Sequence, residues 1–274
     1  MDFIEGKPIK SVLDAVKIAL SERQRFYRGE VSDFRILLPK IFRERYWAGP
    51  EVAFGPCESE KLRKVETDHI YEFKRLAPGF CSDLPGEHNP LNNLKWLFLM
   101  QHHGMPTRLL DWSLNILVAT FFAVTDMDKN NDNKDGQVWS IDHLELNKAS
   151  GIGLALPLPG HPIVEYLARE MFYSLEKKEG LAKNLGLNKI PANPVAILPP
   201  LCWPRMIAQS STFTLHPKPR SWDNIYGATA KLTRHIIPAK AKKKIRIELG
   251  QIGVLHRTLF PELDSIAKDL EQYS

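Results

Sequence analysis

The segment Leu114–Val124 constrains the fold more than any other part of the chain. It is apolar on nearly every side of the helix that its pattern predicts, and such a helix has to be buried on all sides. Ser113, just before it, is a residue type that caps helix N-termini. A Gly-x-Pro turn separates a predicted helix, Leu91–His103, from a predicted strand, Thr107–Trp112. The sequence therefore predicts a helix, a turn, a strand and a second helix at the centre of the domain.

Periodicity predicts further elements on both sides of this unit. An amphipathic helix is expected over residues 11–23 and a short strand over Phe26–Gly29. Later strand candidates are Val195–Leu198, Arg205–His216 and Leu232–Pro238. Two closing helices are expected, Lys240–Gly250 and Pro261–Gln272, and the second places Leu263, Ile266 and Leu270 on one face toward the core. No repeat or linker interrupts the 274 residues, so we expect a single domain over 1–274 with a core from about residue 20.

Composition and charge narrow the class of protein. Hydrophobic residues make up 43% and charged residues 25% of the chain, which is typical of a globular protein. No apolar run approaches the roughly 18 residues of a membrane span, and no signal pattern begins the chain, so a cytoplasmic location without membrane contact is expected. The net charge is +5, and Lys218–Arg246 holds nine basic residues and one acidic residue. This stretch is either a nucleic-acid-binding surface or a solvated helix face with loops.

The segment Gln101–Ser113 gathers the densest set of chemically useful side chains. It reads Gln-His-His-Gly-Met-Pro-Thr-Arg-Leu-Leu-Asp-Trp-Ser, and a helix N-terminus follows that could hold an anion. The candidate site residues in it are His102, His103, Thr107, Arg108 and Asp111. The structural alternative is that Arg108 and Asp111 form a buried ion pair and that the histidines cap the preceding helix.

Two weaker signals accompany this segment. Phe26-Tyr27-Arg28-Gly29 places Arg beside Gly on a strand, where the backbone can approach a ligand and the guanidinium can bind a carboxylate or pyrophosphate. Arg205 and Gln209 lie in a predicted strand, where a glutamine suits amide or ribose recognition or pairs with neighbouring backbone. Metal binding is not expected, because adjacent histidines point about 100° apart on a helix and no HExxH motif is present. There is also no GxSxG, GxGxxG or P-loop motif.

These motifs resemble those of the FRG-domain family, which is named for an aromatic-Arg-Gly motif like the one at Phe26–Gly29. The family signature resembles Gln-His-His-Gly-x-Pro-Thr-Arg-Leu-Leu-Asp-Trp-Thr followed by an apolar helix that ends in Phe-Ala. The chain matches it through Gln101–Trp112. Similar stretches at Arg205–Phe213 and Thr258–Asp264 extend the resemblance from about residue 20 to the C-terminus, with Ser211 where the family pattern has Gly. The family resemblance implies one shared pocket without naming a reaction.

A more distant resemblance is to the ADP-ribosyltransferase superfold, which has an aromatic-Arg-Gly strand facing the phosphates of NAD and a helix similar to Ala119–Ala123. It implies NAD as cofactor. Arg205 stands where the superfold places a catalytic Glu, so the chain departs from ordinary transferase chemistry and is more similar to RNA 2′-phosphotransferases or to a domain that only binds.

Residues and resemblances together predict an α+β domain with a split, mostly antiparallel sheet packed by helices. Its pocket is expected to bind or process NAD or an ADP-ribose-like phosphate ligand. The catalytic candidates are His102, His103 and Asp111, and the ligand-binding candidates are Tyr27, Arg28, Gly29, Thr107, Arg108, Arg205 and Gln209. The alternatives are a nucleic-acid-binding or RNA-processing domain that uses the basic 218–246 region, and a ligand-sensing or interaction module without catalysis.

Overall fold

The structure is a computed structural model of the chain. It describes residues 3–22, 25–32, 37–43, 56–86, 92–125, 131–169, 191, 193–217 and 231–267, and the side chains of 56–63 and 169 are not described. Residues 218–230 of the basic stretch and the end of the predicted second closing helix, including Leu270, lie outside the described residues.

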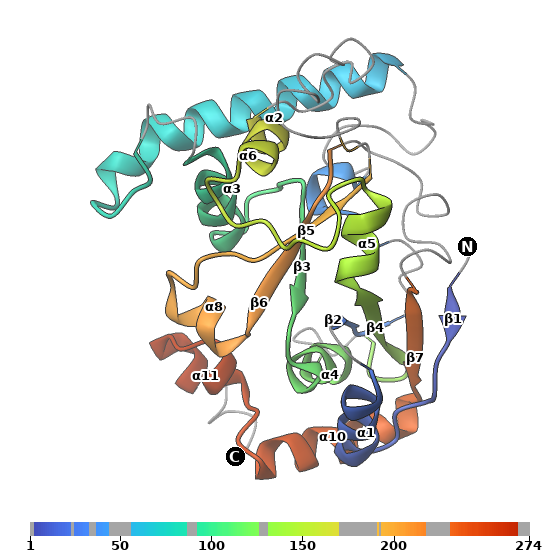
Figure 1. The fold of residues 1–274 in the computed structure, drawn as a ribbon. Helices are drawn as coiled ribbons and strands as arrows, with labels where there is room; N and C mark the ends of the chain where they lie inside the picture. The colour runs from blue at the N-terminus through green and yellow to red at the C-terminus, as the bar shows by residue number, and fades with distance from the viewer. Residues whose placement is uncertain are drawn as a thin grey trace.

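Within these residues, one open sheet runs in the order β1-β7-β4-β2-β3-β6-β5 (Figure 1). Neighbouring strands are antiparallel, except that β1 is parallel to β7. A single residue pair, Tyr27 with Ser113, joins β2 to β3 and so connects the two halves of the sheet. The predicted α+β class with a split, mostly antiparallel sheet is therefore confirmed. The strands are β1 Ile4–Glu5, β2 Arg25–Glu30, β3 Leu109–Ser113, β4 Gly136–Asp142, β5 Val195–Ile197, β6 Ser211–Leu215 and β7 Thr233–Ile237.

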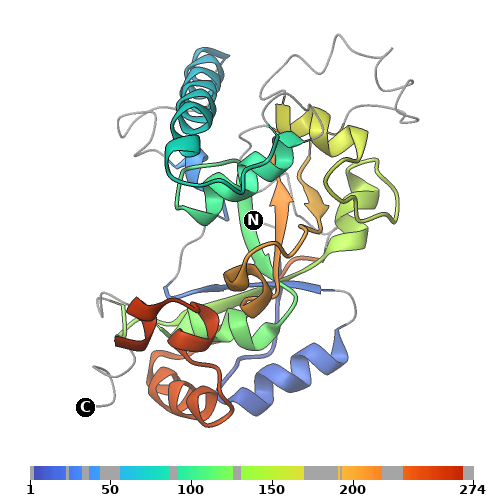
Figure 2. The same ribbon diagram turned by 90° about the vertical axis from the view of Figure 1, so that its left-hand side faces the viewer.

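Three helices cover one face of the β2-β4-β7 half: α1 (Val12–Ser21), α4 (Ile116–Val124) and α10 (Ala239–Gln251). They lie together at one end of the molecule in both views (Figures 1 and 2). The apolar helix α4 lies between the other two and the sheet, as its sequence predicts. The predicted cap was wrong: Asn115 is the N-cap, and its side chain accepts a hydrogen bond from the Leu117 N–H.

The opposite end of the molecule holds α2 (Pro56–Leu76), α3 (Asn93–His102) and α6 (Pro162–Arg169), the last two packed on β3, β5 and β6. The buried Glu165 carboxylate accepts the backbone N–H groups of Leu94 and Gly160, and so joins α6 to the start of α3. Burial raises the pKa of Glu165, against the opposing effect of these hydrogen bonds. The shorter elements are η1 Lys40–Phe42, η3 Ala77–Gly79, α5 His143–Ala149, α8 Pro204–Ala208 and α11 His256–Leu259.

Two expectations for the C-terminal third were wrong at least in part. Of the strand candidate Arg205–His216, the second half forms β6 as expected, whereas Pro204–Ala208 form helix α8, because Pro204 suits the first turn of a helix and Ser210, where φ is +47°, lies between the helix and the strand. Leu263 and Ile266 are 83% and 45% exposed, so they do not face the core. Among the described residues, no helix is long and apolar enough to cross a membrane.

Candidate functional site

A cleft of about 400 Å³ opens where β2 and β3 diverge. If the ladder continued beyond Tyr27 and Ser113, Gly29 would face Asp111. Instead, the Asp111 carbonyl accepts a hydrogen bond from the guanidinium of Arg28, at 2.9 Å from Nη1. The cleft is the space that the interrupted ladder leaves. Its walls come from the ends of β2 and β3, one side of α4, the start of β6, α8 and the turn after α3.

Arg28 is held in the wall of this cleft by three contacts with two residues, Glu30 and Asp111. Its Nε donates to the Glu30 carboxylate at 2.7 Å, and Nη1 lies 3.9 Å from the Asp111 carboxylate in addition to its bond with that residue's carbonyl. The Arg28 side chain is 15% exposed. A guanidinium fixed in this way would lose less side-chain entropy on making a further contact in the cleft.

Gly29 serves the packing of the domain. A Cβ at this position would lie 1.8 Å from the Ala119 carbonyl oxygen of α4. The sequence interpretation assigned this space to an approaching ligand, whereas the helix backbone occupies it. The close approach places Val118, Ala119 and Phe122 of α4 in the apolar wall of the cleft. The N-terminus of α4 is capped by Asn115 and the cleft is lined by the side of the helix, so the expected anion site at that N-terminus is not part of the cleft.

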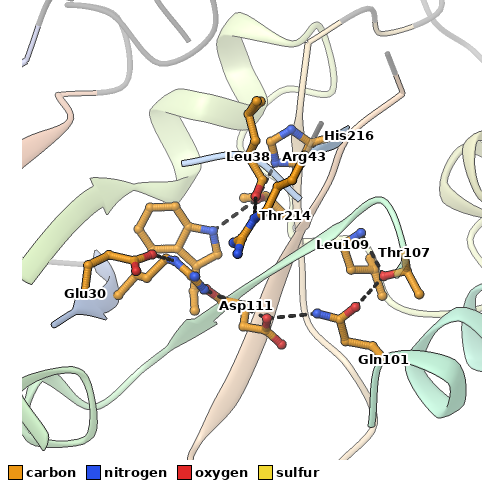
Figure 3. A network of polar contacts seen from close by, with 11 residues as sticks. Glu30, Leu38, Arg43, Gln101, Thr107, Leu109, Asp111, Thr214 and His216 are labelled. Atoms are coloured by element: carbon orange, nitrogen blue, oxygen red, sulfur yellow. Dashed lines mark hydrogen bonds and ion pairs between the residues drawn. The ribbon is translucent and has the colours of Figure 1, made fainter. Parts of the chain in front are cut away.

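Asp111 belongs to a chain of hydrogen bonds that begins inside the domain (Figure 3). The Gln101 Nε2 donates to Asp111 Oδ2 at 2.8 Å, and the Thr107 hydroxyl donates to Gln101 Oε1. Thr107 is fully buried, and its hydroxyl accepts the Leu109 N–H. The Asp111 side chain is 56% exposed and lines the cleft. Thr107 therefore supports the site from the core, one step removed from the cleft itself.

Arg108 lies outside the cleft, in the core. It is fully buried and binds both carboxylate oxygens of Glu66 and the Leu167 carbonyl. The alternative that paired Arg108 with Asp111 was wrong in its partner, because Glu66 of α2 neutralises the guanidinium. This pair joins α2, β3 and α6, and Arg108 is not available to a ligand.

The two histidine rings are in edge-to-face contact, with centroids 5.0 Å apart, but their surroundings differ. His102 lines a side pocket of about 40 Å³ that shares Gln101, Asp111 and Arg205 with the main cleft. Its ring stacks on Trp203, with centroids 5.4 Å apart. Burial lowers the pKa of His102, and the nearby His103 and Arg205 charges lower it further. His103 is exposed and lines neither cavity.

Arg205 and Gln209 line both the cleft and its side pocket. Arg205 extends from α8 over the Phe260 ring, 4.5 Å from its centroid, and the Gln209 amide donates to the Leu259 carbonyl. The C-terminal segment around α11 therefore supports this wall of the cleft.

Sequence reasoning missed Glu30, Lys40 and Gln101 as site residues. Glu30 continues the strand period of β2 and Gln101 begins the 101–113 motif, so both carried a signal. Lys40 lies in η1, whose sequence has no clear period, and its ammonium bonds the Gly104 carbonyl at the rim of the cleft. Only the tertiary structure brings Lys40 to this place.

Fold and site define an α+β domain with a cleft at the split of its sheet, lined by three basic and two acidic side chains. Residues 23–132 match the FRG domain, so this part of the chain is an FRG domain and contains both sequence motifs of the site. The similar stretches at 205–213 and 258–264 lie beyond the matched residues. No curated protein and no solved structure matches the chain. Among the described residues, no three His, Cys, Asp or Glu side chains are grouped to hold a metal ion.

Proposed function

We propose that the FRG domain binds a small phosphate-containing ligand of the NAD or ADP-ribose kind in the cleft between β2 and β3. The observation that carries this proposal is the Arg28 guanidinium, which Glu30 and the Asp111 carbonyl hold in the cleft wall. Lys40 and Arg205 line the same cleft, so its lining carries three cations against the two carboxylates of Glu30 and Asp111, and the excess of positive charge suits an anion.

The size and lining of the cleft support a nucleotide-like ligand. A volume of about 400 Å³ lies within the range of small-molecule sites, roughly 300–1,000 Å³. Met105, Val118 and Phe122 provide an apolar surface against which a ring can pack. A molecule with phosphates for the cations and a ring for this surface matches both halves of the lining.

His102 is the acid–base candidate of the site. Its pKa is lowered, so the imidazole is neutral at neutral pH and can accept a proton. Arg205 stands where the ADP-ribosyltransferase superfold has its catalytic glutamate, so the proposal is for a binding site. Any turnover of the ligand would depend on His102 and Asp111.

The basic helix α10 offers less to nucleic acid than its sequence indicates. The Lys242 ammonium is buried and donates to the Val31 and Asn131 carbonyls, and Arg246 binds Asp132 and the Val124 carbonyl. Two of its cations thus hold the domain together, which favours the small-ligand proposal over a nucleic-acid surface on this helix.

Titration calorimetry with NAD, ADP-ribose and a short RNA tests the proposal. We expect NAD or ADP-ribose to bind with a Kd between about 1 μM and 1 mM. Arg28→Ala should weaken binding at least about tenfold, because a charge-assisted contact is lost, and Arg28→Lys should recover little of it. Arg75→Ala, which removes an exposed arginine on α2, is the matched control and should change nothing.

The other outcomes assign the alternatives. Binding of RNA alone, with a steep salt dependence, would support the nucleic-acid function. Absence of binding to all three probes would leave an interaction module without a nucleotide ligand.

A further inference from the structure

The hydrogen bonds that lead to Asp111 have a fixed direction. The Thr107 hydroxyl accepts the Leu109 N–H, so its own hydrogen is free to point at Gln101 Oε1. That bond leaves the Gln101 NH₂ group facing the Asp111 carboxylate, to which it donates at 2.8 Å. The reverse amide orientation would bring an oxygen against a carboxylate oxygen, so the chain of donors determines which way the glutamine points.

The same chain leaves the Asp111 carboxylate with unused acceptor sites toward the cleft. A carboxylate accepts about four hydrogen bonds, and Gln101 takes one on Oδ2. The side chain is 56% exposed and lines both the cleft and the side pocket. An anionic phosphate would be repelled by this carboxylate, whereas an O–H group would donate to it.

We propose that Gln101 and Thr107 are positioning residues that aim Asp111 at a ribose hydroxyl, and that the cleft thereby selects ribose over deoxyribose. This inference rests on the proposed function, since it concerns the same ligand. The cations Arg28, Lys40 and Arg205 bind the phosphates of the ligand. The Asp111 carboxylate, which lines the same cleft, accepts a hydrogen bond from the uncharged ribose hydroxyl. Rejection of a deoxy ligand is strong when it leaves a polar group of the site without its partner.

The test compares ADP-ribose with its two 2′-deoxy analogues, one for each ribose, by titration calorimetry. The wild-type protein should bind one analogue at least about tenfold more weakly than ADP-ribose, because a hydrogen bond to a charged group is lost. Gln101→Leu should weaken the binding of ADP-ribose about tenfold and the binding of that analogue much less. The two affinities should then differ by no more than about threefold. Gln251→Leu, at an exposed position of α10, is the matched control and should retain full selectivity.

Thr107 gives a second test with its own rescue. Thr107→Val removes the hydroxyl and should lose the selectivity, whereas Thr107→Ser keeps the hydroxyl and should retain it. Thermal melting of each variant shows whether it folds. If Thr107→Val does not fold, the selectivity of Gln101→Leu decides the question.

Full selectivity in Gln101→Leu, or equal wild-type affinity for ADP-ribose and both analogues, would overturn this inference and leave the proposed function standing. Failure of the wild-type protein to bind ADP-ribose or NAD would overturn both.

Discussion

Arg108 and Asp111 are three positions apart in one motif, and their surroundings give them opposite roles. Arg108 is fully buried against Glu66, with side-chain exposures of 1% and 2% for the pair. Asp111 exposes 56% of its side chain to the cleft. A buried pair is costly to break because one charge remains without a partner, whereas an exposed carboxylate is solvated in either state.

Unfolding in urea should separate these two residues. Arg108→Gln should lower the free energy of unfolding by about 3–5 kcal/mol, because it leaves the Glu66 carboxylate buried and unpaired. Asp111→Asn should change it by less than about 0.5 kcal/mol, as expected for an exposed site. A double variant, Arg108→Met with Glu66→Leu, should recover most of the loss. Equal losses in Arg108→Gln and Asp111→Asn would contradict this assignment.

The sequence located these residues but could not sort them by role. The 101–113 motif marks the site, and Arg28, Asp111, Arg205 and Gln209 do line one cleft. The partner of Arg108 is 42 positions away on helix α2, and no local pattern identifies it. A role that depends on a distant partner becomes visible only when the two elements pack.

At the scale of elements, the contact between β2 and α4 builds the cleft wall. Gly29 has no side chain, and this lets the Ala119 carbonyl approach the strand backbone. Gly136 on the neighbouring strand β4 allows the same approach by the Ala123 carbonyl. Two glycines on adjacent strands thus let helix α4 pack closely on the sheet, and the apolar side of that helix lines the cleft.

Gly29→Ala should therefore cost at least about 3 kcal/mol of unfolding free energy, the upper part of the range for overpacking. The added methyl group would meet the Ala119 oxygen at 1.8 Å and the Ala123 nitrogen at 2.8 Å, and both are backbone atoms that cannot move aside alone. Gly79→Ala is the control, since nothing lies within 4 Å of its Cβ position. Thermal melting of the two variants measures the difference, and similar melting temperatures would show that α4 does not pack on β2 as described.

At the scale of the whole molecule, the core holds a histidine. His216 follows β6, is fully buried, and its Nε2 lies 3.0 Å from the Thr214 hydroxyl. That hydroxyl also accepts the Trp112 Nε1–H. Burial lowers the pKa of His216 from 6.5 to about 3.

The pH dependence of stability follows from this shift. Between pH 6.5 and about 3 the unfolded chain binds a proton at His216 that the folded protein does not bind. The contribution of neutral His216 to the free energy of unfolding is therefore fully present above pH 6.5. It is lost as the pH falls, by up to about 1.4 kcal/mol per pH unit. In urea unfolding at pH 7, 6, 5 and 4, His216→Gln should show a slope smaller by about this amount. His103→Gln, at an exposed position, should keep the wild-type slope, and an unchanged slope in His216→Gln would refute the argument.

The sequence by itself determined the class of the fold and the place of the site. A helix without a polar face, such as Leu114–Val124, can only be buried. The strands predicted on both sides of it in the sequence form the sheet against which it packs. Tertiary structure decided the partners: Glu66 for Arg108, the Ala119 carbonyl for Gly29 and Lys40 for the rim of the cleft. It also decided that Arg205 extends from a helix instead of a strand. Periodicity reports which face of an element is apolar, whereas the choice of partner depends on contacts between residues far apart in the chain, and only the packed domain creates them.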